Sequence, residues 1–415
     1  MSTGNSDISP SQPPSEQSLA EVALVFLRLG VTAFGGPAAH IAMMEQEFVR
    51  RRKWLAHQQF LDMLGSVNLI PGPNSTEMAI YIGYLRAGWP GLLLGGVCFI
   101  LPAMFLVAGL AWGYAVCGDL PEITGVLRGV KPVVIAIIVH ALVGLGPKAV
   151  KTPWLGLIAA AALAASLAGL DPLSVVLLCG AIHGMASSRQ DLQAISRWSL
   201  VLLLLAVCGI LMLIHAPHCF TATPSFGNDS SAATDRAGTG EIFLYFLEIG
   251  SVLYGSGYVL LAFLQGDLVP HLLGTKELLD ATSVGQVTPG PLFTTATFIG
   301  FLLGYRSGGL VGGWMGALAG TIGIFLPSFV FIALGGAFFS RLRKSRLAGI
   351  FLDGVNVAAL ALIAAAAWNL GHEALVDKLT FVIAIVSGLL LFRCRLNSAW
   401  LVLAGAVVGL VLSRY

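Results

Sequence analysis

Two phrases of identical composition, Pro71-Gly72-Pro73 and Pro289-Gly290-Pro291, interrupt apolar segments that would otherwise form continuous helices. Proline lacks the backbone N–H donor and clashes with the preceding helical turn, and glycine permits unusual dihedrals, so no regular helix runs through either phrase. In a bilayer, the backbone groups freed by such a break are tolerated only where they face protein or a polar cavity. The phrases therefore predict two helix breaks at which a polar ligand could bind.

Polar side chains flank both phrases. A helix that begins after a break presents unpaired N–H groups and the positive end of its dipole, and both favour an anion. Amide and hydroxyl groups at the same place could donate further hydrogen bonds. These flanking residues are Asn68, Asn74, Ser75 and Thr76 around the first phrase, and Gln286, Thr294 and Thr295 around the second. Asn74 and Glu77 also have the spacing of a capping box.

Glycine-rich phrases break two further apolar segments, where the backbone could approach a ligand closely. Four half-helix starts that converge near the membrane midplane would form a dehydrated, donor-rich pocket, which suits an oxyanion. A plain kink is the alternative for any single break, but the recurrence favours a site. We expect substrate binding at all four breaks, by Gly35, Gly36, Pro37, Pro71, Gly72, Pro73, Gly255, Ser256, Gly257, Pro289, Gly290 and Pro291, and by the flanking polar residues.

Charged residues inside apolar segments are costly in lipid and are usually paired or functional. Arg28 and Glu248 stand at matching positions before the two glycine-rich breaks. They could pair with each other, or Arg28 could contact an anionic substrate. Glu77 is the first candidate to carry a coupling proton, with helix capping as the alternative. His40 could titrate near neutral pH or fill a structural role.

The elements that position these residues are predicted to be membrane helices. Hydrophobic residues make up 56% of the 415 residues and charged residues 11%, against roughly 25% in soluble domains. Continuous apolar runs at 155–170 and 199–214 have helical spanning length and do not alternate as barrel strands do. The six cysteines lack metal or redox spacing, so we expect no metal and no cofactor. The fold class is an all-α polytopic membrane protein.

The chain also repeats itself. Phe26-Leu-Arg-Leu-Gly30 aligns with Phe246-Leu-Glu-Ile-Gly250, the Pro-Gly-Pro phrases align, Asp62 falls on Asp280, and Leu127-Arg-Gly-Val130 matches Leu352-Asp-Gly-Val355. We divide the chain into a disordered tail (1–20), a first half (21–190), a linking helix with a polar external loop (191–240) and a second half (241–415). Six segments per half and one linking helix give about thirteen segments. Because each half has an even number of segments and one helix links them, the second half would have the opposite orientation in the membrane. The pattern predicts two inverted repeats.

Basic residues support this plan, since they favour cytoplasmic loops. Lys148, Lys151, Arg189 and Arg197 mark such loops in the first half, and residues 341–346 with Arg393 and Arg395 mark them in the second. We expect a cytoplasmic N terminus and an external C terminus. Arg128 and Lys131 would then begin a segment near the outer face, where such side chains commonly reach the interface.

A break divides each of the first two segments of each half into two pieces, and each piece is long enough to reach only about halfway across a bilayer. These segments could be interrupted spans or re-entrant hairpins. The basic residues 50–53 would lie outside in the first case and inside in the second. We expect re-entrant hairpins on that charge.

Three stretches identify a family resemblance: Phe34-Gly-Gly-Pro-Ala-Ala-His-Ile41, Arg50-Arg-Arg-Lys-Trp-Leu55 and Leu69-Ile-Pro-Gly-Pro-Asn74, with the second Pro-Gly-Pro at 289–291. From about residue 21 to the C terminus the chain resembles the long-chain, two-domain class of the chromate ion transporter family. The resemblance implies an inner-membrane protein that exports chromate, driven by membrane potential or a proton gradient, and confers chromate resistance. It gives motif status to Gly35, Gly36, Pro37, Pro71, Gly72, Pro73 and Asn74, whereas Gly255-Ser256-Gly257 departs from the Gly-Gly-Pro form.

Two other functions stay open from the sequence. A sulfate or related anion importer or exchanger could use the same pocket. An intramembrane enzyme is disfavoured, because Tyr254-Gly-Ser-Gly257 has the wrong order for an intramembrane serine protease and no His-Glu-x-x-His motif occurs. The expected partners are chromate, with sulfate as the look-alike anion, and the lipid bilayer, with no nucleic acid.

Overall fold

The computed structural model describes residues 16–412 except 69, 119, 189–236, 255–256, 270–271, 345, 395 and 397. Within these residues the chain is helical and contains no strand. The predicted linking helix, most of the external loop, and the site candidates Gly255 and Ser256 lie outside the described residues. Residues 16–20 of the expected tail are helical, because the first helix begins at Glu16.

The first half contains α1 (Glu16–Thr32), α2 (Gly36–Met44), η1 (Glu45–Arg51), α3 (His57–Val67), α4 (Asn74–Cys117), α5 (Pro121–Ala149), α6 (Pro153–Leu167) and α7 (Pro172–Ser188). The second half contains α9 (Thr239–Val252), α10 (Val259–Asp267), α11 (Thr275–Val287), η2 (Leu292–Thr294), α12 (Thr295–Lys344), α13 (Arg346–Ala374), α14 (Lys378–Cys394) and α15 (Ser398–Leu412). The two Pro-Gly-Pro breaks fall between helices, and the Gly35-Gly36-Pro37 break falls at the start of α2.

The long elements α4 and α12 are each two antiparallel arms joined by a tight turn. The turns are at Ala87–Gly88 (φ −141° and 61°) and at Gly308–Gly309 (φ −141° and 58°), so the second position of each needs the left-handed backbone that glycine adopts readily. Small residues let the arms touch: a Cβ on Gly83 would lie 2.2 Å from the carbonyl oxygen of Gly91. The first arm of each element therefore ends at this turn, and the second arm runs back along it.

The first helices of each half also fold back on themselves. Arg52, which follows η1, lies 2.5 Å from Glu21 near the start of α1, and Arg86 near the turn of α4 lies 3.4 Å from the same carboxylate. In the second half, Tyr245 of α9 donates a hydrogen bond of 3.4 Å to Asp267 at the end of α10. The breaks consequently lie at the tips of hairpins whose open ends are held together by polar contacts.

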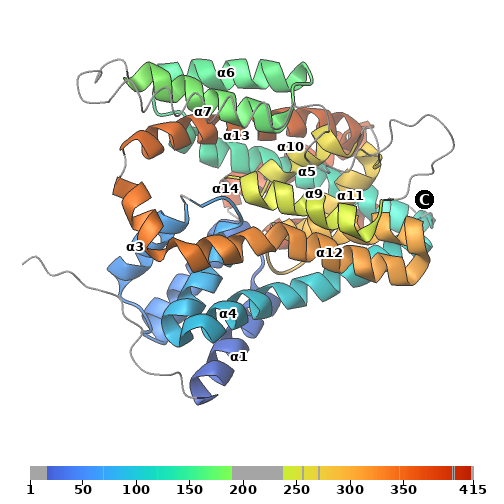
Figure 1. The fold of residues 1–415 in the computed structure, drawn as a ribbon. Coiled ribbons are helices and arrows are strands. Elements are labelled where there is room, and N and C mark those ends of the chain that lie inside the picture. Colours follow the sequence, from blue (N-terminus) through green and yellow to red (C-terminus); the bar gives the residue numbers. More distant parts are fainter. Residues whose placement is uncertain are drawn as a thin grey trace, which may run out of the picture.

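The remaining helices of the two halves are interleaved. In Figure 1, α6 and α7 of the first half lie along α13 of the second, and α5 in turn packs against α14 and α15. Glycines allow the close approach: a Cβ on Gly129 would lie 2.0 Å from the carbonyl oxygen of Gly405, and one on Gly354 would lie 2.6 Å from that of Cys179. Separate folding of the two halves is therefore not expected.

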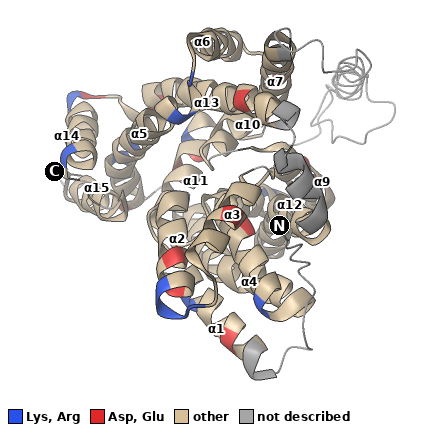
Figure 2. Ribbon diagram, turned by 90° about the vertical axis from the view of Figure 1, so that its left-hand side faces the viewer, with Lys and Arg blue, Asp and Glu red and all other residues tan. Residues whose placement is uncertain are grey.

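Four helical stretches are long and apolar enough to cross a membrane by length and composition: Asn74–Cys117, Glu122–Ala149, Leu292–Gly335 and Gly349–Ala374. The first and third contain the turns described above. Shorter apolar helices at Pro153–Leu167, Pro172–Ser187 and Ser398–Val411 accompany them. Charged residues are sparse on the ribbon in Figure 2, and the densest basic group lies at the end of η1.

Candidate functional site

The hairpin tips of the two halves are joined reciprocally through their backbones. The N–H of Gly72 donates to the carbonyl oxygen of Leu253, and the N–H of Gly290 donates to that of Ala33, both at 2.8 Å. Both glycines have positive φ, 134° and 102°. Each Pro-Gly-Pro phrase therefore binds the end of the first helix of the opposite half.

Neither glycine has room for a side chain. A Cβ on Gly72 would lie 2.5 Å from both the Glu77 carboxylate and the Ser328 hydroxyl, and one on Gly290 would lie 2.6 Å from the Cβ of Ala103. We call the contact of Gly72 with Leu253 the first crossing and the contact of Gly290 with Ala33 the second crossing. Polar groups from α4 and α12 thus lie beside the first crossing, whereas a methyl group lies beside the second. The two crossings share a backbone arrangement and differ in chemistry.

Beside the first crossing lies a polar cavity of about 310 Å³. Asn68, at the end of α3, and Asn74, at the start of α4, meet there, and the Asn74 amide donates to the Asn68 oxygen at 2.6 Å. Lys148 from α5 and Asn356 from α13 line the opposite walls, and Val259 at the start of α10 completes the ring of elements. Both halves therefore contribute to one cavity at a helix break.

This lining can bind an anion. Amide N–H groups are neutral hydrogen-bond donors, the Lys148 ammonium supplies one positive charge, and α4 begins at the cavity, so its dipole favours negative charge there. The remainder of the wall is apolar and includes Leu145 and Leu360. A small tetrahedral oxyanion with some of its water fits this volume and polarity.

The capping-box prediction at the start of α4 is wrong. Pro73 occupies the N-cap position and no side chain caps the helix. Asn74 bonds to Asn68 instead, and Glu77 turns back toward the break, where the Ser328 hydroxyl donates to it at 3.3 Å. Because Pro73 holds the N-cap, the polar groups of this turn are available to the cavity and to the crossing.

Glu77 is fully buried, with 0% of its surface exposed. One carboxylate oxygen contacts Ser328, and the other has no hydrogen-bond partner among the described residues, nor does the hydroxyl of the equally buried Thr76. Ser75 is buried beside them. A buried carboxyl with one free oxygen is strongly disfavoured as a bare anion, so this position favours a proton or a ligand.

The second Pro-Gly-Pro is more self-contained than the first. Thr294 and Thr295 donate their hydroxyls to the carbonyl oxygens of Pro291 and Leu292, at 2.9 and 2.8 Å. Gln286 is buried and hydrogen-bonds with Tyr258, although its side-chain nitrogen has no partner among the described residues. The predicted site residues of this break are thus close together, but their hydroxyls already have backbone partners.

The Gly35-Gly36-Pro37 break is joined to the second Pro-Gly-Pro. Gly35 and Gly36 have φ of 101° and 80°, and Pro37 occupies the first turn of α2. His40 is buried and its Nε2 donates to the carbonyl oxygen of Ala33 at 3.0 Å, the same oxygen that accepts from Gly290. This geometry places His40 in a structural role at the crossing. Gly257, from the fourth break, is buried against Leu292.

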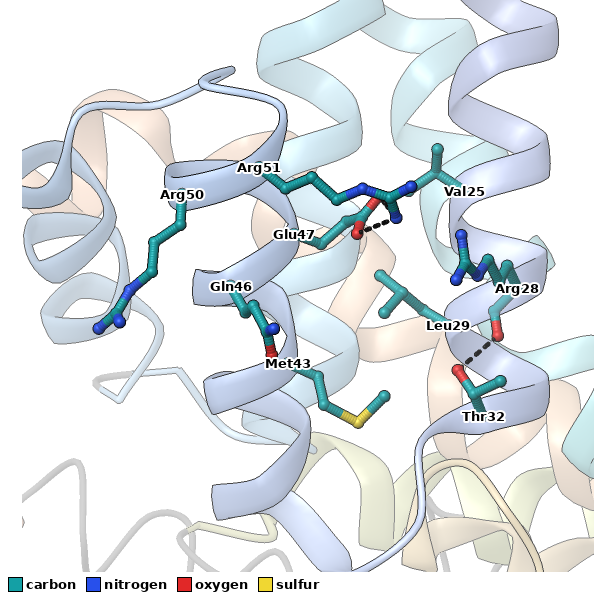
Figure 3. A pocket seen from close by; sticks show the side chains of 9 residues that line it. All are labelled: Val25, Arg28, Leu29, Thr32, Met43, Gln46, Glu47, Arg50 and Arg51. Atoms are coloured by element: carbon teal, nitrogen blue, oxygen red, sulfur yellow. Dashed lines mark hydrogen bonds and ion pairs between the residues drawn. The ribbon is translucent and has the colours of Figure 1, made fainter.

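Arg28 and Glu248 do not pair with each other in the part of the chain that the structure describes. Both are exposed, Arg28 on α1 and Glu248 on α9. Arg28 instead lines a separate cleft between α1 and η1, shown in Figure 3. Opposite charges at aligned positions were therefore not a guide to an ion pair.

Several polar residues of the interior were not predicted as site residues. Lys131 does not reach toward an interface: its ammonium lies 2.9 Å from the carboxylate of Asp280, whose side chain is 0% exposed, and Tyr114 donates to the same carboxylate at 2.9 Å. The buried Ser328 and the exposed Asn356, which lines the cavity, were not predicted either. The available signal in both cases was a polar residue within an apolar helix. Asn356 comes directly after the repeated Leu-Asp-Gly-Val355, and Ser328 comes directly after Pro327. The sequence predicts a loop at Lys148, whereas the structure places this residue in the last turn of α5.

Comparison with known proteins gives one consistent result. The sequence model described as "Chromate transporter" matches residues 20–185 and 240–410. The chain is 30% identical over 411 residues to the "Chromate transport protein" of Cupriavidus metallidurans, covering 95% of this chain and 93% of that one. It is 29% identical to the "Probable chromate transport protein" of Synechococcus elongatus, with 95% of each chain covered, and 28% identical to the "Chromate transport protein" of Pseudomonas aeruginosa, with 97% and 94% covered.

No solved structure matches the chain. The three relatives are named for chromate transport, so the sulfate alternative is not favoured, and a family of transporters leaves the enzyme alternative without support. The apolar helices agree with a membrane protein. With the family model covering both halves, the chain belongs to the chromate transporter family.

Proposed function

We propose that this protein exports chromate from the cytoplasm across the inner membrane, through the cavity lined by Asn68, Asn74, Lys148 and Asn356. That cavity is the observation that carries the proposal, since it combines amide donors and an ammonium group at a helix break. Chromate is a tetrahedral dianion, and the donors approach the cavity from several directions. The export direction would give the cell chromate resistance.

An inverted repeat underlies the proposed mechanism. Its support is the reciprocal bonding of Gly72 and Gly290, the near-identical dihedrals at Gly88 and Gly309, and the match of one family model to two stretches of the chain. Inverted repeats place a substrate site at their interface and expose it alternately to each side. The cavity lies at such an interface, because α3 and α4 meet α13 and the start of α10 there.

The proposed orientation follows the basic residues, with the N terminus in the cytoplasm and the C terminus outside. The cavity is lined by Lys148, in the last turn of α5, and Lys151 just beyond that helix pairs with Asp353 of α13 at 2.7 Å. These helix ends would face the cytoplasm, so the cavity would be open toward the side from which chromate is taken.

Energy for export would come from the membrane potential. Moving each negative charge outward gains about 2.3 kcal/mol per 100 mV when the inside is negative, and chromate carries two charges. A proton would be an addition to this driving force, and Glu77 is its candidate carrier, because it is buried next to the crossing with one free oxygen. The protein would then act as a secondary transporter.

The test is chromate flux in inside-out vesicles under an imposed potential of either sign. Accumulation should rise when the potential favours movement of anions into the vesicle, which corresponds to export from the cell. Lys148→Gln and Asn356→Ala should each reduce it about tenfold or more, since a charge-assisted hydrogen bond to the anion is worth roughly 1.5–3 kcal/mol. Asn369→Ala, at an exposed position on the same helix as Asn356, is the matched control. Equal flux in the cavity variants and the control would refute this site, and absent flux in the parent protein would refute the function.

A further inference from the structure

A second cavity, distinct from the proposed substrate site, lies between α1 and the α2–η1 arm. Its volume is about 570 Å³. Arg28 and Arg51 extend into the space between the two helices, whereas Arg50 points away from it (Figure 3). The Gln46 amide also lines it, and Val25, Leu29 and Met43 supply apolar walls. A basic cleft with apolar walls suits an amphipathic anion.

The charges of this cleft are not balanced from within. Glu47 is its one acidic residue and bonds to Arg51 at 3.0 Å and to Arg52 at 2.6 Å. Burial opposes ionisation of Glu47, but the hydrogen bonds and charges of Arg52 and Arg51 hold its pKa below the usual value. Arg52 lies outside the lining and also pairs with Glu21, so Glu47 is shared between Arg51 of the cleft and a residue beyond it. Arg28 has no acidic partner among the described residues.

The outer face of α1 beside the cleft is apolar. Leu24, Leu27 and Val31 are 69%, 42% and 52% exposed, and Arg28 lies among them. Residues at these spacings share one face of a helix. In a membrane protein such a face contacts acyl chains, so Arg28 would stand where the chains of a lipid meet its headgroup.

We propose that the cleft between α1 and η1 binds the headgroup of an anionic phospholipid, with its phosphate between Arg28 and Arg51 and its acyl chains along Leu24, Leu27 and Val31. The apolar face favours a lipid over a free oxyanion, because it places acyl chains beside Arg28, where a headgroup attached to those chains can enter the cleft. Basic pockets between membrane helices bind such headgroups on the cytoplasmic side, where residues 50–53 would lie.

The sequence of the second half does not repeat the arginines of this cleft. Glu248 stands where Arg28 stands in the first half, and at the same offset Pro270 and His271 stand where Arg50 and Arg51 stand. A group required for both faces of a transport cycle would be expected in both halves. The asymmetry agrees with binding to one leaflet.

The test uses the purified full-length protein in detergent, with phosphatidylglycerol and phosphatidylcholine as probes and bound lipid counted by native mass spectrometry. We expect phosphatidylglycerol to bind preferentially. Arg28→Gln should weaken it roughly fivefold, the contribution of one basic residue near an anionic surface, and Arg28→Gln with Arg51→Gln should weaken it further. Arg28→Lys should retain the preference, and Arg393→Gln, an exposed arginine on α14, should leave it unchanged.

Two results would overturn the proposal. The first is equal binding of phosphatidylglycerol to the parent protein and to the double variant. The second is displacement of the lipid by millimolar chromate or glycerol 3-phosphate, which would make the cleft a site for free oxyanions. Chromate flux is measured separately, so a protein that fails to transport can still pass or fail this test.

Discussion

Gly72 shows why a single residue type is needed at the tip of a hairpin. Its φ of 134° is unfavourable for any residue with a side chain, and its N–H binds the opposite half. The lack of a Cβ also leaves room for the Glu77 carboxylate and the Ser328 hydroxyl, which would each lie 2.5 Å from it. Position 72 therefore combines a backbone requirement with a packing requirement.

We predict that Gly72→Val abolishes chromate flux. The backbone strain alone is on the order of 1–3 kcal/mol, and the added methyl groups would displace Glu77 and Ser328 from the crossing. Flux in vesicles is the measurement, normalised to the amount of protein in the membrane. Gly109→Val on α4, where a Cβ would meet nothing within 4 Å, is the matched control and should transport normally. Normal flux by the Gly72 variant would remove the crossing from the mechanism.

Glu77 allows a separate prediction about the proton. If it carries one, Glu77→Gln should remove the dependence of chromate flux on pH while the protein still inserts, because glutamine keeps the size and the contact with Ser328 but cannot ionise. Ser328→Ala keeps the carboxylate and should shift the pH profile without flattening it. An unchanged pH profile in the glutamine variant would assign Glu77 to structure alone.

Residues of the site could be predicted from sequence only where both partners lie close in the chain. Asn68 and Asn74 flank one Pro-Gly-Pro, and the structure brings them together at 2.6 Å. Lys148 and Asn356 reach the same cavity from α5 and α13, and nothing in the local sequence indicates that these helices meet there. Pairing Arg28 with Glu248 failed for the same reason, since alignment between halves gives equivalence and not contact.

At the scale of elements, the hairpins explain how half-helices can end inside the protein. The Pro-Gly-Pro break joins α3 to the first arm of α4, and the turn at Gly88 reverses the chain into the second arm. The breaks could be predicted from the proline and glycine residues of the sequence. The reciprocal hydrogen bonds of the hairpin tips could not, because each involves a partner in the opposite half. Charge at the open ends, such as Arg52 with Glu21, fixes which ends lie together.

Accessibility of introduced cysteines tests the membrane side of these hairpins. In a cysteine-free background, Lys53→Cys and Lys151→Cys should both react with an impermeant maleimide only from the cytoplasm, and Lys378→Cys, at the exposed start of α14, only from outside. The expectation follows from hairpins that enter and leave by one face. Labelling of the cysteine at position 53 from outside would show that the first segments span, and labelling at position 378 is the control for intact cells.

For the whole molecule, the proposed inverted repeat relates the residues of the cavity to residues of the other half. Asn68 and Asn356 line the cavity near the first crossing, and the aligned residues of the other half are Gln286 and Lys131. These two are buried, and Lys131 is held by Asp280, with Tyr114 on the same carboxylate. In an alternating-access cycle, the Lys131–Asp280 pair would therefore close the outer side while the cavity is open to the cytoplasm.

The last prediction concerns that outer closure. With Gln286→Cys as the sole cysteine, adding Asp280→Asn should speed its labelling by an external maleimide, because an unpaired buried Lys131 favours the state in which water reaches it. Removing one partner of a buried pair also destabilises a protein by about 3–5 kcal/mol, so Asp280→Asn with Lys131→Gln is needed to separate gating from unfolding. The double variant should recover thermal stability and keep the fast labelling. Asp62→Asn, at the aligned and exposed position of the first half, should change neither. Slow labelling in both the Asp280 variant and the double variant would mean that the Lys131–Asp280 pair serves packing alone and that the outer path opens elsewhere.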